Sequence, residues 1–283
     1  MSNSLSYLPA LYAASFGAGS SILNTMYGGG TSVSGGTVDP VQALRTAQQS
    51  ETQQVKVTAA DPMVKSAIGA FTTAVRSATS IKQLLSNPNV MNVLLTANGM
   101  KDQIGYTALA TQVLMSNLSD PKSLANTLTD TRWKTLAQTY NFNTKGLAAI
   151  QNPTVIASVT NTYAQSEWQS NQDTVTPGLS NALYFLSHAS SATSVYQILG
   201  DPTLRTVVTT ALGVPQQIAF QDLGAQAQAI TSRLNISQFQ TPSFVQSFAQ
   251  RYLIQNSANS TNVSTGAPTD LTTLAIQAQG VVA

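Results

Sequence analysis

The sequence contains no cysteine and a single histidine, His188, and only 8% of its 283 residues are charged, against about 25% in an average soluble domain. Without cysteine the chain has no thiol nucleophile, no disulfide and no cysteine-based zinc site. With one histidine it has no site built on two imidazoles. The composition therefore predicts no enzymatic activity, no metal and no cofactor, and it designates no catalytic, cofactor-binding or metal-binding residue.

Charge of either sign is also scarce, with 13 Lys+Arg against 11 Asp+Glu. Nucleic acids and anionic membranes are bound through clustered basic residues, which this chain lacks, so neither is an expected partner. No segment approaches the ~18 consecutive apolar residues of a membrane-spanning helix, so we expect no membrane insertion. The first basic residue is Arg45, which disfavours a secretory signal peptide and leaves the cytoplasm or leaderless export as the expected routes.

What the chain does contain is 42% apolar residues, enough for a sizeable core. Eight prolines directly follow Asp, Asn or Thr, a pair that suits the N-cap and first position of a helix. Apolar residues after these pairs recur at helical spacing, so we predict an all-α fold. The pairs are Asp39-Pro40, Asp61-Pro62, Asn87-Pro88, Asp120-Pro121, Asn152-Pro153, Thr176-Pro177, Asp201-Pro202 and Thr241-Pro242.

One block of sequence occurs twice. Residues 78–106 align without a gap to residues 192–220, at an offset of 114, and 12 of the 29 positions are identical. Such self-similarity indicates an internal tandem duplication of a multi-helix unit. In both copies we expect a short helix, followed by a second helix that ends at a glycine in the left-handed conformation. The end of the first helix and the glycine after the second are Ser86 and Gly99 in the first copy, and Gly200 and Gly213 in the second.

The duplication divides the chain into six segments. Residues 17–38 are rich in glycine and serine, which favours flexibility, and residues 257–268 have the composition of a linker. Both extreme ends carry apolar residues at a spacing of three to four, compatible with a narrow helix–helix contact. The predicted segments are a flexible N-terminal segment (1–38), an N-terminal helix (39–61), repeat unit 1 (62–146), a connecting helix (147–175), repeat unit 2 (176–256) and a C-terminal linker with a short helix (257–283).

The single histidine and the carboxylates are the candidate catalytic residues, but their sequence contexts favour structural roles over catalysis. A histidine base needs a nucleophile and an orienting acceptor, but Ser187 and Ala189 flank His188, which favours a surface or helix-packing role. Paired carboxylates could still catalyse hydrolysis. Four acids precede proline as expected caps, and three others form no motif. The expected caps are Asp39, Asp61, Asp120 and Asp201, and the three others considered are Glu167, Asp173 and Asp222.

Aromatic residues and glycines form two further clusters. An aromatic set in the first unit and its counterpart in the second could form an exposed binding face, but their helical spacing favours core packing. These residues are Trp133, Tyr140 and Phe142, with Phe244, Phe248 and Tyr252. Gly28-Gly29-Gly30 lacks the context of a phosphate-binding loop, and we interpret it as a hinge.

The segment DTRWKTLAQTYNF (130–142) and the repeated block A-T-S-[IV]-x-Q-[LI]-L-x-[ND]-P resemble a domain-of-unknown-function family found chiefly in alphaproteobacteria. Its members commonly carry this unit in two or more copies and are often encoded among flagellar genes. The resemblance covers about residues 62–256 and implies association with the flagellum, but it supplies no catalytic residue. One departure is Asn87, where the second copy keeps the family's usual aspartate at Asp201, and either residue can cap a helix.

The resemblance and the composition together predict a non-enzymatic structural or assembly component of the bacterial flagellum. Export through the flagellar channel requires an unfolded chain, which the absence of disulfides permits. Segments 1–38 and 257–283 are expected to contact other flagellar or export-apparatus proteins, and self-association into a homo-oligomer stays open. The alternative is a cytoplasmic chaperone or regulator that binds flagellar export substrates, and the third hypothesis is a carboxylate-based enzyme.

Overall fold

The computed structural model describes residues 39–265, with side chains to Asn259. Every regular element in this range is a helix, which confirms the all-α prediction. The predicted segment 1–38, with its glycine hinge, and residues 266–283 of the predicted C-terminal segment lie outside the described residues. Over 39–265 no helix combines the length and apolar character needed to cross a membrane.

The helices are short to medium in length, and short 3₁₀ helices (η) link several of them. In chain order the elements are α2 (Pro40–Ala60), α3 (Pro62–Ser77), α4 (Ile81–Leu85), α5 (Pro88–Ala97), η1 (Lys101–Gln103), α6 (Thr107–Leu114), α7 (Leu124–Thr127), α8 (Thr131–Tyr140), α9 (Phe142–Lys145), α10 (Ala148–Gln151), α11 (Pro153–Gln172), α12 (Leu179–His188), η2 (Ala189–Ser191), α13 (Val195–Leu199), α14 (Pro202–Ala211), η3 (Gln216–Phe220), α15 (Leu223–Thr231), η4 (Ile236–Gln240) and α16 (Pro242–Thr265).

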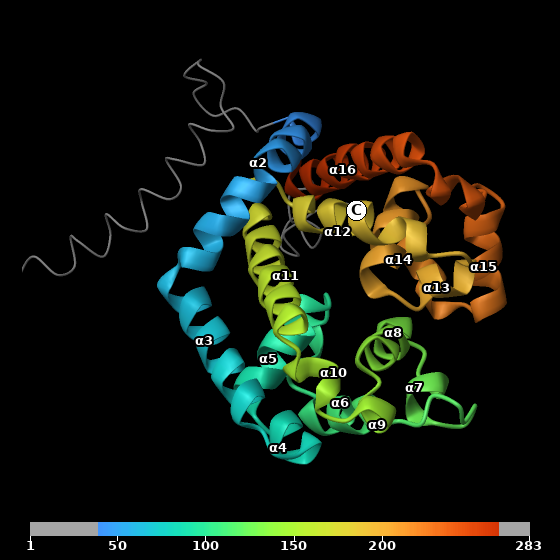
Figure 1. Cartoon of the computed structure of the whole chain (residues 1–283). Helices are drawn as coiled ribbons and strands as arrows, with labels where there is room; N and C mark the ends of the chain where they lie inside the picture. Colours follow the sequence, from blue (N-terminus) through green and yellow to red (C-terminus); the bar gives the residue numbers. More distant parts are fainter. Residues whose placement is uncertain (1–38, 266–283) are drawn as a thin grey trace, which may run out of the picture.

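The described chain closes on itself (Figure 1). Helices α2 and α3 follow one side, α4 to α9 form the opposite end, and α11 returns between them to the second half, where α16 comes back beside α2. The side-chain amides of Gln48 and Gln246 join these two helices through a reciprocal pair of hydrogen bonds of 2.9 and 3.0 Å. The first and last described helices are therefore neighbours.

Two hydrophobic cores lie in the two halves. One is built from residues between Val64 and Ala164, on α3 to α11. The other contains residues of α12 to α16, together with Trp168 of α11 and Ala43, Leu44 and Ala47 of α2. Helix α2 thus contributes to a core whose other members lie far along the chain.

Six of the eight proline pairs begin a helix at the proline, as predicted. The side chains of five preceding residues accept hydrogen bonds from backbone amides of the first turn, as expected for N-caps. These caps are Asp39, Asp61, Asn87, Asn152 and Asp201. The sixth pair precedes α16, which begins at Pro242.

The other two pairs, and one boundary, were predicted wrongly. Asp120 accepts a hydrogen bond from the Lys122 amide within a turn, because Asp before proline suits a turn as well as a cap. Helix α12 begins only after Gly178, at φ +87°, since a turn between Thr176 and Leu179 comes first. The linker expected from residue 257 is helical to Thr265, because extending an existing helix needs no new nucleus.

The order of elements in the repeated block is the same in both copies. Helices α4 and α5 have bounds that differ by 114 from those of α13 and α14, and a 3₁₀ helix and a further α-helix follow each pair. Gly99 and Gly213 have φ values of +70° and +63°, which confirms the left-handed glycines. The duplication itself stays a prediction from the sequence.

Candidate functional site

The two halves meet at a cluster of charged side chains, unusual in a chain with so little charge. It lies where the end of α5, the start of α8, the middle of α11 and the α13–α14 turn approach one another. Its members are Lys101, Asp102, Asp130, Arg132, Glu167 and Asp201. We refer to this region as the junction.

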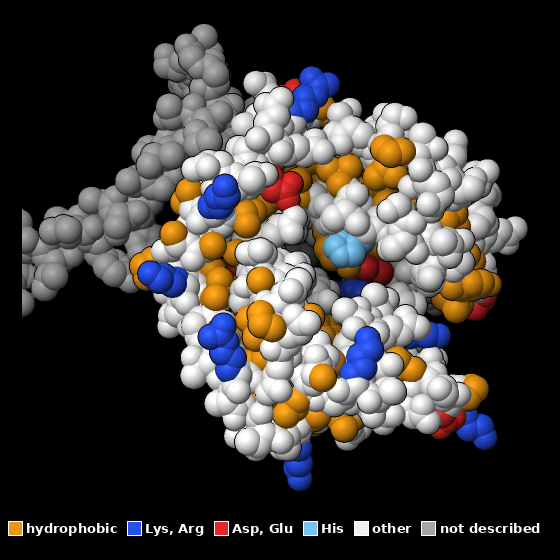
Figure 2. Space-filling view, in the orientation of Figure 1, with side chains coloured by type: hydrophobic (Ala, Val, Ile, Leu, Met, Phe, Trp, Pro, Cys, Tyr) orange, Lys and Arg blue, Asp and Glu red, His pale blue; other side chains and the backbone are white. Residues whose placement is uncertain are grey.

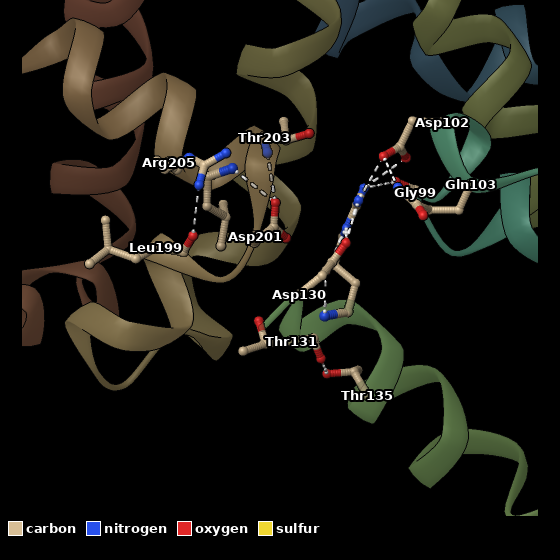
Figure 3. Close-up of polar contacts among 12 residues, drawn as sticks. Gly99, Asp102, Gln103, Asp130, Thr131, Thr135, Leu199, Asp201, Thr203 and Arg205 are labelled. Carbon is tan, nitrogen blue, oxygen red and sulfur yellow. Dashed lines mark hydrogen bonds and ion pairs between the residues drawn. The ribbon is translucent and has the colours of Figure 1, made fainter. Parts of the chain in front are cut away.

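Arg132 is the centre of the junction, and its side chain is only 6% exposed. Asp130 caps α8, and its carboxylate also accepts from Nε of Arg132 at 3.1 Å and from Nη2 at 2.7 Å. Asp102 accepts from Nη1 at 3.1 Å and Nη2 at 2.9 Å, and the Gly99 carbonyl accepts from Nη1 at 2.8 Å (Figure 3). These contacts occupy all five guanidinium N–H groups, so Arg132 holds protein groups together and has no donor left for a ligand.

The charges stabilise one another. Burial alone would lower the pKa of Arg132, but hydrogen bonds and charge from Asp130 and Asp102 raise it above its ordinary value. Burial alone would raise the pKa of Asp102, but hydrogen bonds from Arg132 and Gln103, with the charge of Arg132, hold it below its usual value. The ion pairs are therefore formed throughout the physiological pH range.

Two glycines allow the halves to approach closely. The backbone N–H of Thr131 donates to the carbonyl of Gly200 at 2.9 Å, and a Cβ atom on Gly200 would lie 2.7 Å from the carbonyl oxygen of Thr129. A Cβ atom on Gly99 would lie 2.5 Å from a ring carbon of Tyr184. Any side chain at either position would push the halves apart.

Tyr184 and Asp201 form the second-half side of the junction. The Tyr184 hydroxyl donates to Asp201 Oδ2 at 2.8 Å, while Oδ1 of the same carboxylate caps α14. Burial, followed by the charge of Asp201 and its hydrogen bond, raises the pKa of Tyr184 above its usual value, so the phenol stays protonated. The ring of His188 stacks on Tyr184, with centroids 3.9 Å apart.

Two adjoining cavities border the junction. The larger, about 450 Å³, lies between α11 and α12, and the smaller, about 320 Å³, shares Arg132, Tyr184 and His188 with it. Figure 2 shows the single histidine, pale blue, beside a hollow in this face. The aromatic pair thus stands at the boundary between the two spaces.

The three acids considered as candidate catalytic residues have separate partners. Glu167 accepts from Lys101 Nζ at 3.0 Å, Asp173 accepts from the amide and hydroxyl of Ser180, and Asp222 caps α15. Within residues 39–265, no group of three or more His, Asp or Glu side chains is arranged to hold a metal ion. His188, the other candidate, lies half-buried with Nδ1 2.9 Å from the Tyr184 carbonyl.

The predicted core role of the aromatic residues is confirmed. Trp133, Tyr140, Phe142, Phe248 and Tyr252 are at most 4% exposed, and Phe244 is partly buried against the same core as Phe248. None of the six forms an exposed binding face.

Sequence reasoning missed Arg132, Asp102 and Tyr184. The signal that could have found the junction is the difference between the two copies. At the offset of 114, Tyr184 corresponds to Ala70 and Gly200 to Ser86, and Asp102 corresponds to Gln216. These three positions of the junction differ between the otherwise similar copies.

The fold and junction define an all-α protein with two cores, and with a buried arginine clamp in the first half at the place where the halves meet. Residues 97–245 match the model of a family described as "Protein of unknown function (DUF1217)". Because this match spans more than half of the chain, the protein belongs to the DUF1217 family. The matched range includes Gly99, Asp102, Arg132, Tyr184 and Gly200, and the expected membership of a family of unknown function is confirmed.

The chain is also similar to the crystal structure of a protein from Agrobacterium tumefaciens, with a TM-score of 0.67 and 24% sequence identity. The similarity covers 79% of this chain and 96% of that one, and at this identity it supports the fold alone. No curated protein matches the chain.

Proposed function

We propose that this protein acts without catalysis, as a structural or assembly component linked to the bacterial flagellum. The observation that carries the proposal is the arrangement of Arg132, whose five donors are all used to join protein groups. Arg132 ties the end of α5 to the start of α8, and these two segments contact the second half directly, through the Thr131 amide on the Gly200 carbonyl and through Gly99 against Tyr184. A fixed geometry is what a component that fits between partner proteins requires.

The flagellar part of the proposal is supported by the resemblance to a family often encoded among flagellar genes, and by composition. A chain that passes through a narrow export channel must unfold and then refold. The absence of cysteine removes covalent cross-links, and both cores and the junction are held by noncovalent contacts alone. Segments 1–38 and 257–283 are the parts of the chain that we propose to contact flagellar or export-apparatus proteins.

Deletion of the gene tests the proposal, with swimming, filament assembly and the presence of the protein in purified hook-basal bodies and culture supernatant as readouts. We expect a motility defect that the wild-type gene restores. An Arg132→Met gene should restore motility less well than a Lys134→Met gene, since Lys134 is exposed on the same helix.

Normal swimming of the deletion strain, together with strict retention of the protein inside cells, would contradict the proposal. Co-purification with one unassembled flagellar subunit, without any protein in the supernatant, would replace it with the chaperone or regulator alternative.

A further inference from the structure

The larger cavity is open to solvent on one side and is lined mainly by polar side chains. One face of α11 and one face of α12 supply most of the lining, and no Leu, Ile, Val, Met or Phe side chain takes part. The hydroxyl and amide groups are Thr96, Thr162, Gln165, Ser166, Gln169, Ser170, Ser180, Asn181, Ser187, Thr203 and Thr206.

Several of these groups have unused hydrogen-bonding capacity. Ser166, Gln169 and Ser170 follow one another along the cavity face of α11, and Thr203 lies opposite on α14. Across residues 39–265 their side chains have no hydrogen-bond partner. By contrast, neighbouring Thr162 donates to the carbonyl of Ser158. The free groups can therefore donate to and accept from whatever fills the space.

The charges beside the cavity are already paired. Lys101 is bound to Glu167, and Arg132 to Asp102 and Asp130. An anionic ligand would find no unpaired cation, and a cationic ligand would compete with Arg132 or Lys101 for the carboxylates. The chemistry of the lining therefore fits an uncharged ligand.

We propose that this cavity binds a neutral, polyhydroxylated small molecule, a saccharide of one or two residues. Its volume of about 450 Å³ falls within the usual range for small-molecule sites, about 300–1,000 Å³. Sugar hydroxyls replace water at the free Ser, Thr and Gln groups without loss of hydrogen bonds. The half-buried ring of His188, whose other face stacks on Tyr184, gives the wall an aromatic surface against which sugar C–H groups can pack. The proposal does not depend on the flagellar one.

Isothermal titration calorimetry of the full chain tests the proposal. The probes are glucose, galactose, maltose and trehalose, with glucuronate and glucosamine as charged counterparts. The test variant is Ser166→Leu, which places an apolar side chain in the cavity. Ser170→Leu, nearer the exposed rim, is the second variant if the first does not fold. Ser158→Leu makes the same change on an exposed position of α11 outside the cavity and is the matched control.

We expect at least one neutral saccharide to bind with a Kd of about 1 mM or tighter, and the cavity variant to weaken it at least about tenfold. The Ser158→Leu protein should bind as the wild type does. The proposal is overturned if none of the neutral probes binds, if the charged counterparts bind as well or better, or if the cavity variant leaves the affinity unchanged.

Discussion

Replacement of Arg132 by methionine tests the role of the junction most directly. Methionine keeps a long, apolar stem but removes every guanidinium donor, so Asp102, Asp130 and the carbonyl of Gly99 lose their shared partner. Breaking a buried ion pair from one side costs about 3–5 kcal/mol. The carboxylates of Asp130 and Asp102 are 20% and 49% exposed and regain water, which lowers the expected loss to about 2–3 kcal/mol.

The measurement is urea-induced unfolding followed by circular dichroism. Arg132 ties together the segments at Gly99 and Thr131, which are the ones that contact the second half. We therefore also expect the variant to unfold less cooperatively, as a lower slope or two separate transitions. The matched control is Lys134→Met, an exposed position on the same helix, which should change stability by less than about 0.5 kcal/mol. If Arg132→Met lowered the free energy of unfolding by less than about 1 kcal/mol and left the cooperativity unchanged, the proposed role of Arg132 would be refuted.

Three further predictions concern single positions. Gly200→Ala should destabilise the protein by about 1–3 kcal/mol, because the new Cβ would meet the Thr129 carbonyl. The control Gly69→Ala, with nothing within 4 Å of the new Cβ, should stabilise it by up to about 1 kcal/mol. Equal effects of the two substitutions in urea unfolding would refute this. Thr176→Val should raise stability by about 1 kcal/mol, since the buried Thr176 hydroxyl has no partner within residues 39–265, and a fall in Tm would count against it. The pKa of Asp102 is depressed in the folded state, so its contribution is present above the unfolded value of about 3.9 and is lost as the pH falls through the folded value. The stability difference between wild type and Asp102→Asn should therefore shrink between about pH 5 and pH 3, and a constant difference would exclude this linkage.

The helical fold could be predicted because its signals are local. An Asx-Pro pair sets the cap and the first φ angle without help from the rest of the chain, and the glycines at 99 and 213 need only their own left-handed conformation. The predictions at Asp120 and Thr176 were wrong because the same residues also suit turns. At those two sites the contacts made by the residues after the pair, and not the pair itself, decide between a turn and a helix.

The junction could not be predicted in the same way. Asp130 and Arg132 are neighbours on one helix end, but Asp102 and Gly99 reach them only through folding, and Tyr184 comes from the other half. Each of these residues also has an ordinary explanation on its own. Only the distances between them show that Arg132 is fully paired.

Helix α2 has a mechanical consequence. Ala43, Leu44 and Ala47 are completely buried in the core formed mainly by α12 to α16, and Gln48 is bonded to Gln246. During synthesis, α2 is made first, but the core in which it packs is complete only after α12 to α16 have been made. Contacts between residues this far apart in the sequence slow folding. Conversely, a force that pulls on Asp39 acts first on the half of the molecule at the other end of the sequence.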